Sequence, residues 1–234
     1  MRKASLLAVL LLAAACAPLV KPPAVSEPPR APAAFPEEFY RQAGERGEPV
    51  FRIDPQRSQA VIHVYRGGPL ARFGHDHAIA SRRLHGYILL PRRLDAAQAD
   101  LYVPLESLSV DDPALRAQAG FDTTVSAADI AGTRRNMLEK VLEAERYPFA
   151  VLHLSRPEGE LPALILNAEI GLHGVTQTLR LPVEIEPAAG ELRAHGRFSL
   201  RQTEFGITPY SLLGGALQVQ DRIDLEFEVR ARRL

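Results

Sequence analysis

Along much of the chain the apolar residues occur at every second position, which is the period of a β-strand with one buried face. Residues 164–173 and 178–186 both follow this alternation. It is longest near the C-terminus, where Val219, Ile223, Leu225, Phe227, Val229 and Ala231 would face one way and the polar residues between them the other. Each of these segments is therefore predicted to be a strand with one face on a core and the other in water.

Shorter segments with similar character predict further strands. They span residues 51–53, 60–65, 84–90, 99–104, 149–154 and 192–201. Glycine, proline and other turn-forming residues separate most of them. About nine strands joined by short turns predict an all-β antiparallel sandwich or barrel, and a closed barrel would leave no exposed sheet edges.

Residues 126–145 break the two-residue period and have helical spacing. Their apolar stripe consists of Ile130, Met137, Leu138, Val141 and Leu142. Ser126 followed by Asp129 resembles a capping box, and Pro148 ends the segment because the residue before a proline avoids helical dihedrals. The pattern predicts one α-helix inserted into the β-structure as a lid or plug.

The N-terminus resembles a lipoprotein signal peptide, over residues 1–16. Arg2 and Lys3 precede the apolar run 6–12, which is too short to span a membrane, and three alanines lead to Cys16. We expect an exported protein that is lipidated at Cys16 and attached to a membrane on the periplasmic side. Ala17 in place of a retaining aspartate favours the outer membrane. The alternative is cleavage after Ala15, which would release a soluble protein.

Residues 17–47 are predicted to be a proline-rich tether, with a short helix near its end. Prolines interrupt alanine, valine and glutamate there, and no apolar period is present up to residue 36. The remaining span, 48–234, has the length of one domain.

Composition narrows the classes of function. The chain has 28 basic and 28 acidic residues in an interspersed arrangement, so a nucleic-acid partner is not expected. Cys16 is the single cysteine, so no disulfide and no thiolate zinc site can form within the domain. The sequence contains no recognised catalytic motif, and we expect a binding protein rather than an enzyme.

Several ordered blocks resemble the YceI-like family. They are Phe-Arg-Ile-Asp at 51–54, Arg-Tyr-Pro-Phe at 146–149, Leu-His-Gly-Val-Thr at 172–176, Thr-Glu-Phe-Gly-Ile at 203–207 and Val-Gln-Asp-Arg-Ile at 219–223. The resemblance covers nearly all of 48–234. It implies an extended, eight-stranded, lipocalin-like antiparallel β-barrel with one inserted α-helix near its mouth.

The resemblance also implies that the barrel binds a polyisoprenoid or another long lipid in an apolar channel. Apolar strand positions supply the candidate ligand-binding residues, with a histidine at the polar mouth: Leu166, Ile170, Leu181, Phe198, Leu225, Phe227 and His75. The alternative is that the same apolar residues fill the barrel as an ordinary core, which would make the protein a structural module without a ligand.

The resemblance departs at Gly74-His75-Asp76-His77. On a strand, His75 and His77 would project to one face and could bind one divalent metal ion, with His63 as a third ligand. The same two histidines could instead hydrogen-bond the head group of a lipid, or lie on an exposed rim beside a turn at Gly74. The sequence leaves these three interpretations open.

Overall fold

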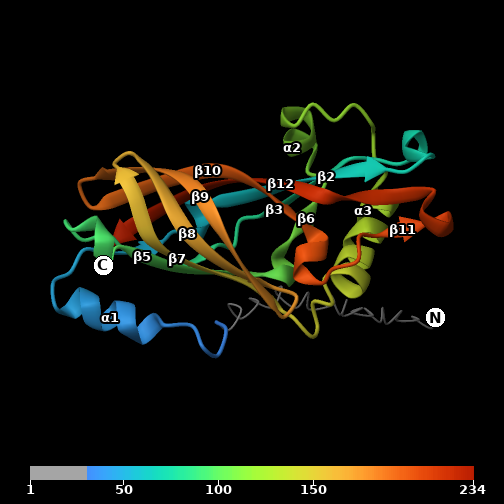
Figure 1. Ribbon diagram of the computed structural model, residues 1–234. Coiled ribbons are helices and arrows are strands. Elements are labelled where there is room, and N and C mark those ends of the chain that lie inside the picture. Colours follow the sequence, from blue (N-terminus) through green and yellow to red (C-terminus); the bar gives the residue numbers. More distant parts are fainter. Residues whose placement is uncertain (1–30) are drawn as a thin grey trace, which may run out of the picture. The chain divides into compact units, whose positions relative to one another are not determined.

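Eight antiparallel strands form a closed ring in the computed structural model, which describes residues 31–234. In ring order they are β1 (Val50–Ile53), β4 (His85–Leu89), β5 (Gln98–Pro104), β7 (Phe149–Glu160), β8 (Ala163–Leu172), β9 (Val175–Ala188), β10 (Glu191–Arg201) and β12 (Leu217–Arg233). The ring closes because β1 pairs with the end of β12, where Ile53 lies opposite Ala231. The predicted eight-stranded barrel is confirmed (Figure 1).

Four further strands lie outside the ring, and the sequence pattern predicted one of them, at residues 60–65. Residues 218–228 of β12 pair with β2 (Gln59–Gly67). In turn β2 pairs with β3 (His77–Ser81), and β3 pairs with β6 (Ser109–Val110). A further strand, β11 (Ser211–Leu212), also pairs with β12. The segment of β3 gave no strand prediction because four of its five residues are buried, so polar and apolar positions do not alternate.

The predicted turn between β8 and β9 is a tight hairpin. His173 and Gly174 both have positive φ, at 53° and 78°. A Cβ on Gly174 would lie 2.7 Å from a ring carbon of Tyr147, so the turn also packs closely against the segment before β7. Glycine is required at this position for both reasons, and the hairpin sets the register in which Leu166 lies opposite Leu181.

The inserted helix is present but changes form along its length. Helix α3 (Ala127–Asn136) begins at Ser126, whose hydroxyl accepts from the Asp129 amide, and continues as a π-helical turn over Met137–Val141. Arg134 joins α3 to β6 and the preceding turn by donating to the carbonyl oxygens of Glu106 and Leu108. Figure 1 shows α3 beside β6 and β11 at one end of the barrel.

Helix α1 (Glu37–Glu45) belongs to the barrel unit rather than to a tether. The Tyr40 hydroxyl donates to Asp100 Oδ2 on β5 at 2.6 Å, and the Tyr40 and Ala43 side chains are fully buried. The unit therefore begins upstream of residue 48 and includes residues from Ala31 onward. The predicted signal peptide, Cys16 and the first part of the predicted tether lie outside the described residues.

The remaining helix is α2 (Pro113–Gln118), between β6 and α3. The Asp112 side chain caps it by accepting from the amides of Ala114 and Leu115, and Pro113 occupies its first turn. No helix within residues 31–234 combines the length and the apolar character needed to cross a membrane.

Candidate functional site: an apolar cavity with one polar end

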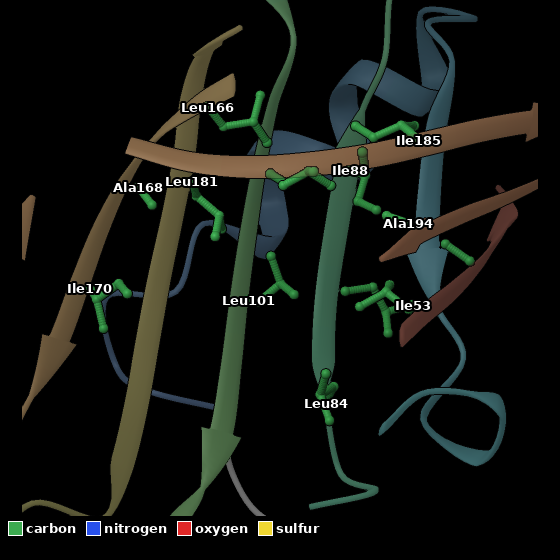
Figure 2. Packing of buried hydrophobic residues seen from close by; sticks show 14 of the residues in the cluster. Ile53, Leu84, Ile88, Leu101, Leu166, Ala168, Ile170, Leu181, Ile185 and Ala194 are labelled. Atoms are coloured by element: carbon green, nitrogen blue, oxygen red, sulfur yellow. The ribbon is translucent and has the colours of Figure 1, made fainter. Parts of the chain in front are cut away.

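The barrel encloses a cavity of about 630 Å³, which is within the range of sites that hold small molecules. Its wall is formed mainly by the inward-facing apolar side chains of β2, β3, β4, β5, β7, β8, β9, β10 and β12. Figure 2 shows Ile88, Leu101, Leu166 and Leu181 gathered between the strands that carry them. The walls thus offer a ligand burial from water and few hydrogen bonds.

The cavity is long, and buried side chains fill the part of the barrel that follows it along β12. Along β12 it is lined from Val219 to Val229, a span of roughly 30 Å at the rise of a β-strand. Beyond Val229, the interior is filled by Ile53, Leu192 and Ala231, which are each at most 3% exposed and do not line the cavity. A ligand would therefore lie along the barrel, beside this plug.

All seven residues proposed from the sequence as ligand-binding residues line this cavity. They are His75, Leu166, Ile170, Leu181, Phe198, Leu225 and Phe227. The apolar members come from four strands, and alternation along each strand turns them to the interior. Whether they contact a ligand stays a prediction, but the structure brings them to one site.

The end of the cavity opposite the plug is polar. This end is formed by α3, the start of β3 and the segments around β11, and its polar lining residues are Arg66, His75, His77, Asp129, Thr133, Asn136, Gln202, Tyr210 and Gln218. Sheet register places His77 in a row with Val64, Ile223 and Leu200, all of which line the cavity. The polar and apolar parts are therefore continuous.

His77 at this end is held by a buried ionic network. Its Nδ1 lies 2.6 Å from Oδ2 of Asp111, whose side chain is fully buried. The other carboxylate oxygen of Asp111 accepts from the Ala78 amide at 3.0 Å and from Arg116 at 2.7 Å. Arg116 also donates to the carbonyl and hydroxyl of Thr123. Because Asp111 is itself held by the Ala78 amide and by Arg116, the position of the His77 ring is strongly restrained.

The same contacts determine the charge of Asp111. Burial acts to raise the pKa of its carboxyl, but the hydrogen bonds from His77 and Arg116 act in the opposite direction, and the pKa is lowered overall. Asp111 is thus ionised at neutral pH. Its φ of 58° is unusual for a residue other than glycine, and it allows the main chain to turn from β6 toward α2 while the carboxylate stays under His77.

The three histidines proposed as metal ligands are not brought together. The rings of His75 and His77 lie 6.3 Å apart and both line the cavity. His63 is on the outer face of β2, opposite Ala78, with its Nε2 3.9 Å from Glu226 and its ring against Phe121. Alternation along β2 turns Ile62 and Val64 inward and therefore His63 outward.

Within residues 31–234, one group of three potential metal ligands has its ligand atoms close together: Glu184, Glu186 and His195. These residues lie on the outer faces of β9 and β10 and the two glutamates are exposed. Arg193 lies 3.6 Å from Glu186 and neutralises part of the group. The cluster does not touch the cavity.

The sequence analysis missed Asp111 and Arg116. The local sequence Asp111-Asp112-Pro113 predicts the start of a helix, with Asp112 as its cap and Pro113 in its first turn. It predicts no role for Asp111. Nothing in the pattern links Asp111 to a histidine 34 positions earlier. That link exists because β6 pairs with β3.

Solved structures with this fold were found at low sequence identity. The structure of BcnA from Burkholderia cenocepacia superposes with a TM-score of 0.58 at 11% identity, covering 76% of this chain and 98% of that chain. A polyisoprenoid-binding domain from Saccharophagus degradans, implicated in plant cell wall breakdown, gives 0.55 at 12% identity, covering 79% and 98%. At these identities the likeness shows a shared fold. No match was found among curated proteins.

Structural likeness at these identities does not assign a family, but comparison of the sequence does. The profile of the YceI-like domain matches residues 51–231, which includes every strand of the closed ring except parts of β1 and β12. Because this match covers most of the chain, the protein belongs to the YceI-like family.

Proposed function

We propose that the protein binds and carries a long apolar ligand of the isoprenoid class in the barrel cavity. The observation that carries this proposal is the cavity itself, which is roughly 30 Å long and is lined almost wholly by apolar side chains away from its polar end. The related fold from Saccharophagus degradans is described as a polyisoprenoid-binding domain, which supports this class of ligand.

The physical basis of binding is removal of the ligand chain from water. Each buried CH₂ group contributes about 0.8 kcal/mol, so roughly ten such groups give about 8 kcal/mol before the costs of association are subtracted. The apolar wall supplies no directional contacts, and selection in the deep part of the cavity therefore depends on the width and length of the chain.

The proposal includes export and attachment to a membrane through a lipid on Cys16, on the evidence of residues 1–16 alone. A lipid anchor would keep an apolar carrier beside the membrane that supplies or accepts its cargo. Expression of the full chain and of Cys16→Ser in a bacterial host tests this part. We expect the wild type in the membrane fraction with an acylated N-terminus, and recovery of both proteins in the soluble fraction would contradict it.

A pair of matched alanine substitutions tests the binding site. Ala60 lines the cavity on β2, whereas Ala163 is exposed at the start of β8. The affinity for a C20 isoprenoid chain, measured by displacement of a fluorescent apolar probe, should fall at least tenfold in Ala60→Phe and stay unchanged in Ala163→Phe. Equal affinity in both variants would place binding outside the cavity, and no binding by the wild type would refute the proposed function.

A further inference from the structure

The polar end of the cavity contains one imidazole nitrogen whose chemistry is set by the protein. We propose that Nε2 of His77 accepts a hydrogen bond from the terminal hydroxyl group of the apolar ligand, so that the protein selects long-chain alcohols. This inference rests on the proposed function and adds the chemical class of the head group.

The first step is the tautomer of His77. The Asp111 carboxylate is paired with Arg116 and accepts from the Ala78 amide, and its Oδ2 lies 2.6 Å from Nδ1, so it is an acceptor of hydrogen bonds there. Nδ1 must therefore carry the proton. Arg116, at 2.7 Å, already balances the charge of Asp111. In neutral His77 the other nitrogen, Nε2, is then an acceptor.

The second step is the position of this acceptor. His77 lines the cavity with its side chain 15% exposed, and Nδ1 points to the buried Asp111, so Nε2 is on the opposite edge of the ring. Among residues 31–234, no protein group hydrogen-bonds to Nε2, whereas Nδ1 is paired. Behind His77 on the same face of β3 lies Ile79, beside Ile62 of β2, so an apolar chain can continue from the head group into the barrel.

The third step concerns the cations at this end, because a phosphate or carboxylate binds most strongly where a cation is free to pair with it. Arg116 is committed to Asp111 and Thr123. Arg66 donates to the Gly74 carbonyl at 3.0 Å and lies 3.5 Å from Asp76. With both arginines engaged and an acceptor at Nε2, the site is complementary to a hydroxyl donor.

Discrimination between an alcohol and its ether tests the inference directly. In the full-chain protein, a C20 isoprenoid alcohol and its methyl ether would each displace a fluorescent apolar probe. The alcohol should bind about 2- to 10-fold more tightly, which is the effect of one hydrogen bond. In His77→Phe the two affinities should become equal through loss of alcohol affinity, and in His63→Phe, on the outer face, the preference should persist.

The other possible results would overturn the inference, each for a different reason. Equal binding of alcohol and ether by the wild type, or a preference that survives His77→Phe, would overturn the inference while leaving the proposed function intact. Tighter binding of the phosphate monoester than of the alcohol would overturn it in favour of an anion site. Loss of the preference after treatment with EDTA would assign the head-group contact to a metal at His75 and His77. If neither chain binds, the proposed function fails as well.

A spectroscopic measurement keeps the inference testable if His77→Phe does not fold. Long-range ¹H–¹⁵N NMR spectra of histidine-labelled wild-type protein should show His77 protonated at Nδ1 and not at Nε2. Addition of the alcohol should shift the Nε2 resonance, and addition of the ether should not. A proton on Nε2 in the free protein would overturn the inference.

Discussion

The Nδ1 atom of His77 lies 2.6 Å from Oδ2 of Asp111, joining the first residue of β3 to the residue that follows β6. The contact links the wall of the cavity to a fully buried carboxylate and, through it, to Arg116 and α2. The polar end of the cavity is thus supported by a largely buried ionic network, and this network has consequences for stability.

Loss of the Asp111 carboxylate should destabilise the fold strongly. Asp111→Ala would leave Arg116 buried without its counter-charge, and breaking a buried pair in this way costs about 3–5 kcal/mol. Asp122→Ala is the matched control, because the Asp122 side chain is 81% exposed and should contribute less than about 0.5 kcal/mol. Urea unfolding followed by circular dichroism measures both. Similar values for the two variants would contradict the role of the network.

The contribution of Asp111 should depend on pH in the acidic range. The pKa of its carboxyl is lower in the folded protein than the ordinary value of about 3.9, so the unfolded chain binds this proton first as the pH falls. The stability that Asp111 supplies is full above pH ~4 and is lost as the pH falls through the folded pKa. The difference in unfolding free energy between wild type and Asp111→Asn should shrink as the pH falls below 4.

Helix α1 should be necessary for the full stability of the barrel. Tyr40 is fully buried, stacks on Tyr87 with ring centroids 5.4 Å apart and donates to Asp100. We expect Tyr40→Ala to lower the unfolding free energy by about 3–5 kcal/mol. Its neighbour Phe39 is 41% exposed, and Phe39→Ala should cost clearly less. If both substitutions have equal small effects in thermal and urea unfolding, α1 contributes nothing to the stability of the domain.

Two glycines should respond in opposite directions to alanine. Gly86 on β4 has φ of 154°, and a Cβ there would lie 2.2 Å from the Asp100 carbonyl oxygen on β5, so Gly86→Ala must displace a strand. Gly132 lies within α3 and has open space around it. Gly132→Ala should stabilise the protein by about 0.5–1 kcal/mol, whereas Gly86→Ala should destabilise it by more than about 1 kcal/mol. Melting temperatures that move in the same direction would refute this.

The sequence by itself determined most of the strands and which of their faces are buried, while the pattern left a sandwich or a barrel open and the family resemblance indicated the barrel. Strict alternation in residues such as Leu166, Ile170 and Leu181 states which face of a strand is buried, because successive side chains in a strand point to opposite sides. The capping pattern at Ser126 likewise located the start of α3, since capping depends on residues three positions apart. Such features are local in the chain, and a single sequence carries them.

Only the tertiary structure decided how the polar residues combine. The direction of His63 depends on its register in β2, and the pairing of His77 with Asp111 depends on the hydrogen bonds between β3 and β6. The barrel unit begins before residue 48 because the Tyr40 hydroxyl reaches Asp100, 60 positions away. These contacts join residues that are far apart in the chain, and the alternation of apolar and polar residues does not predict such contacts.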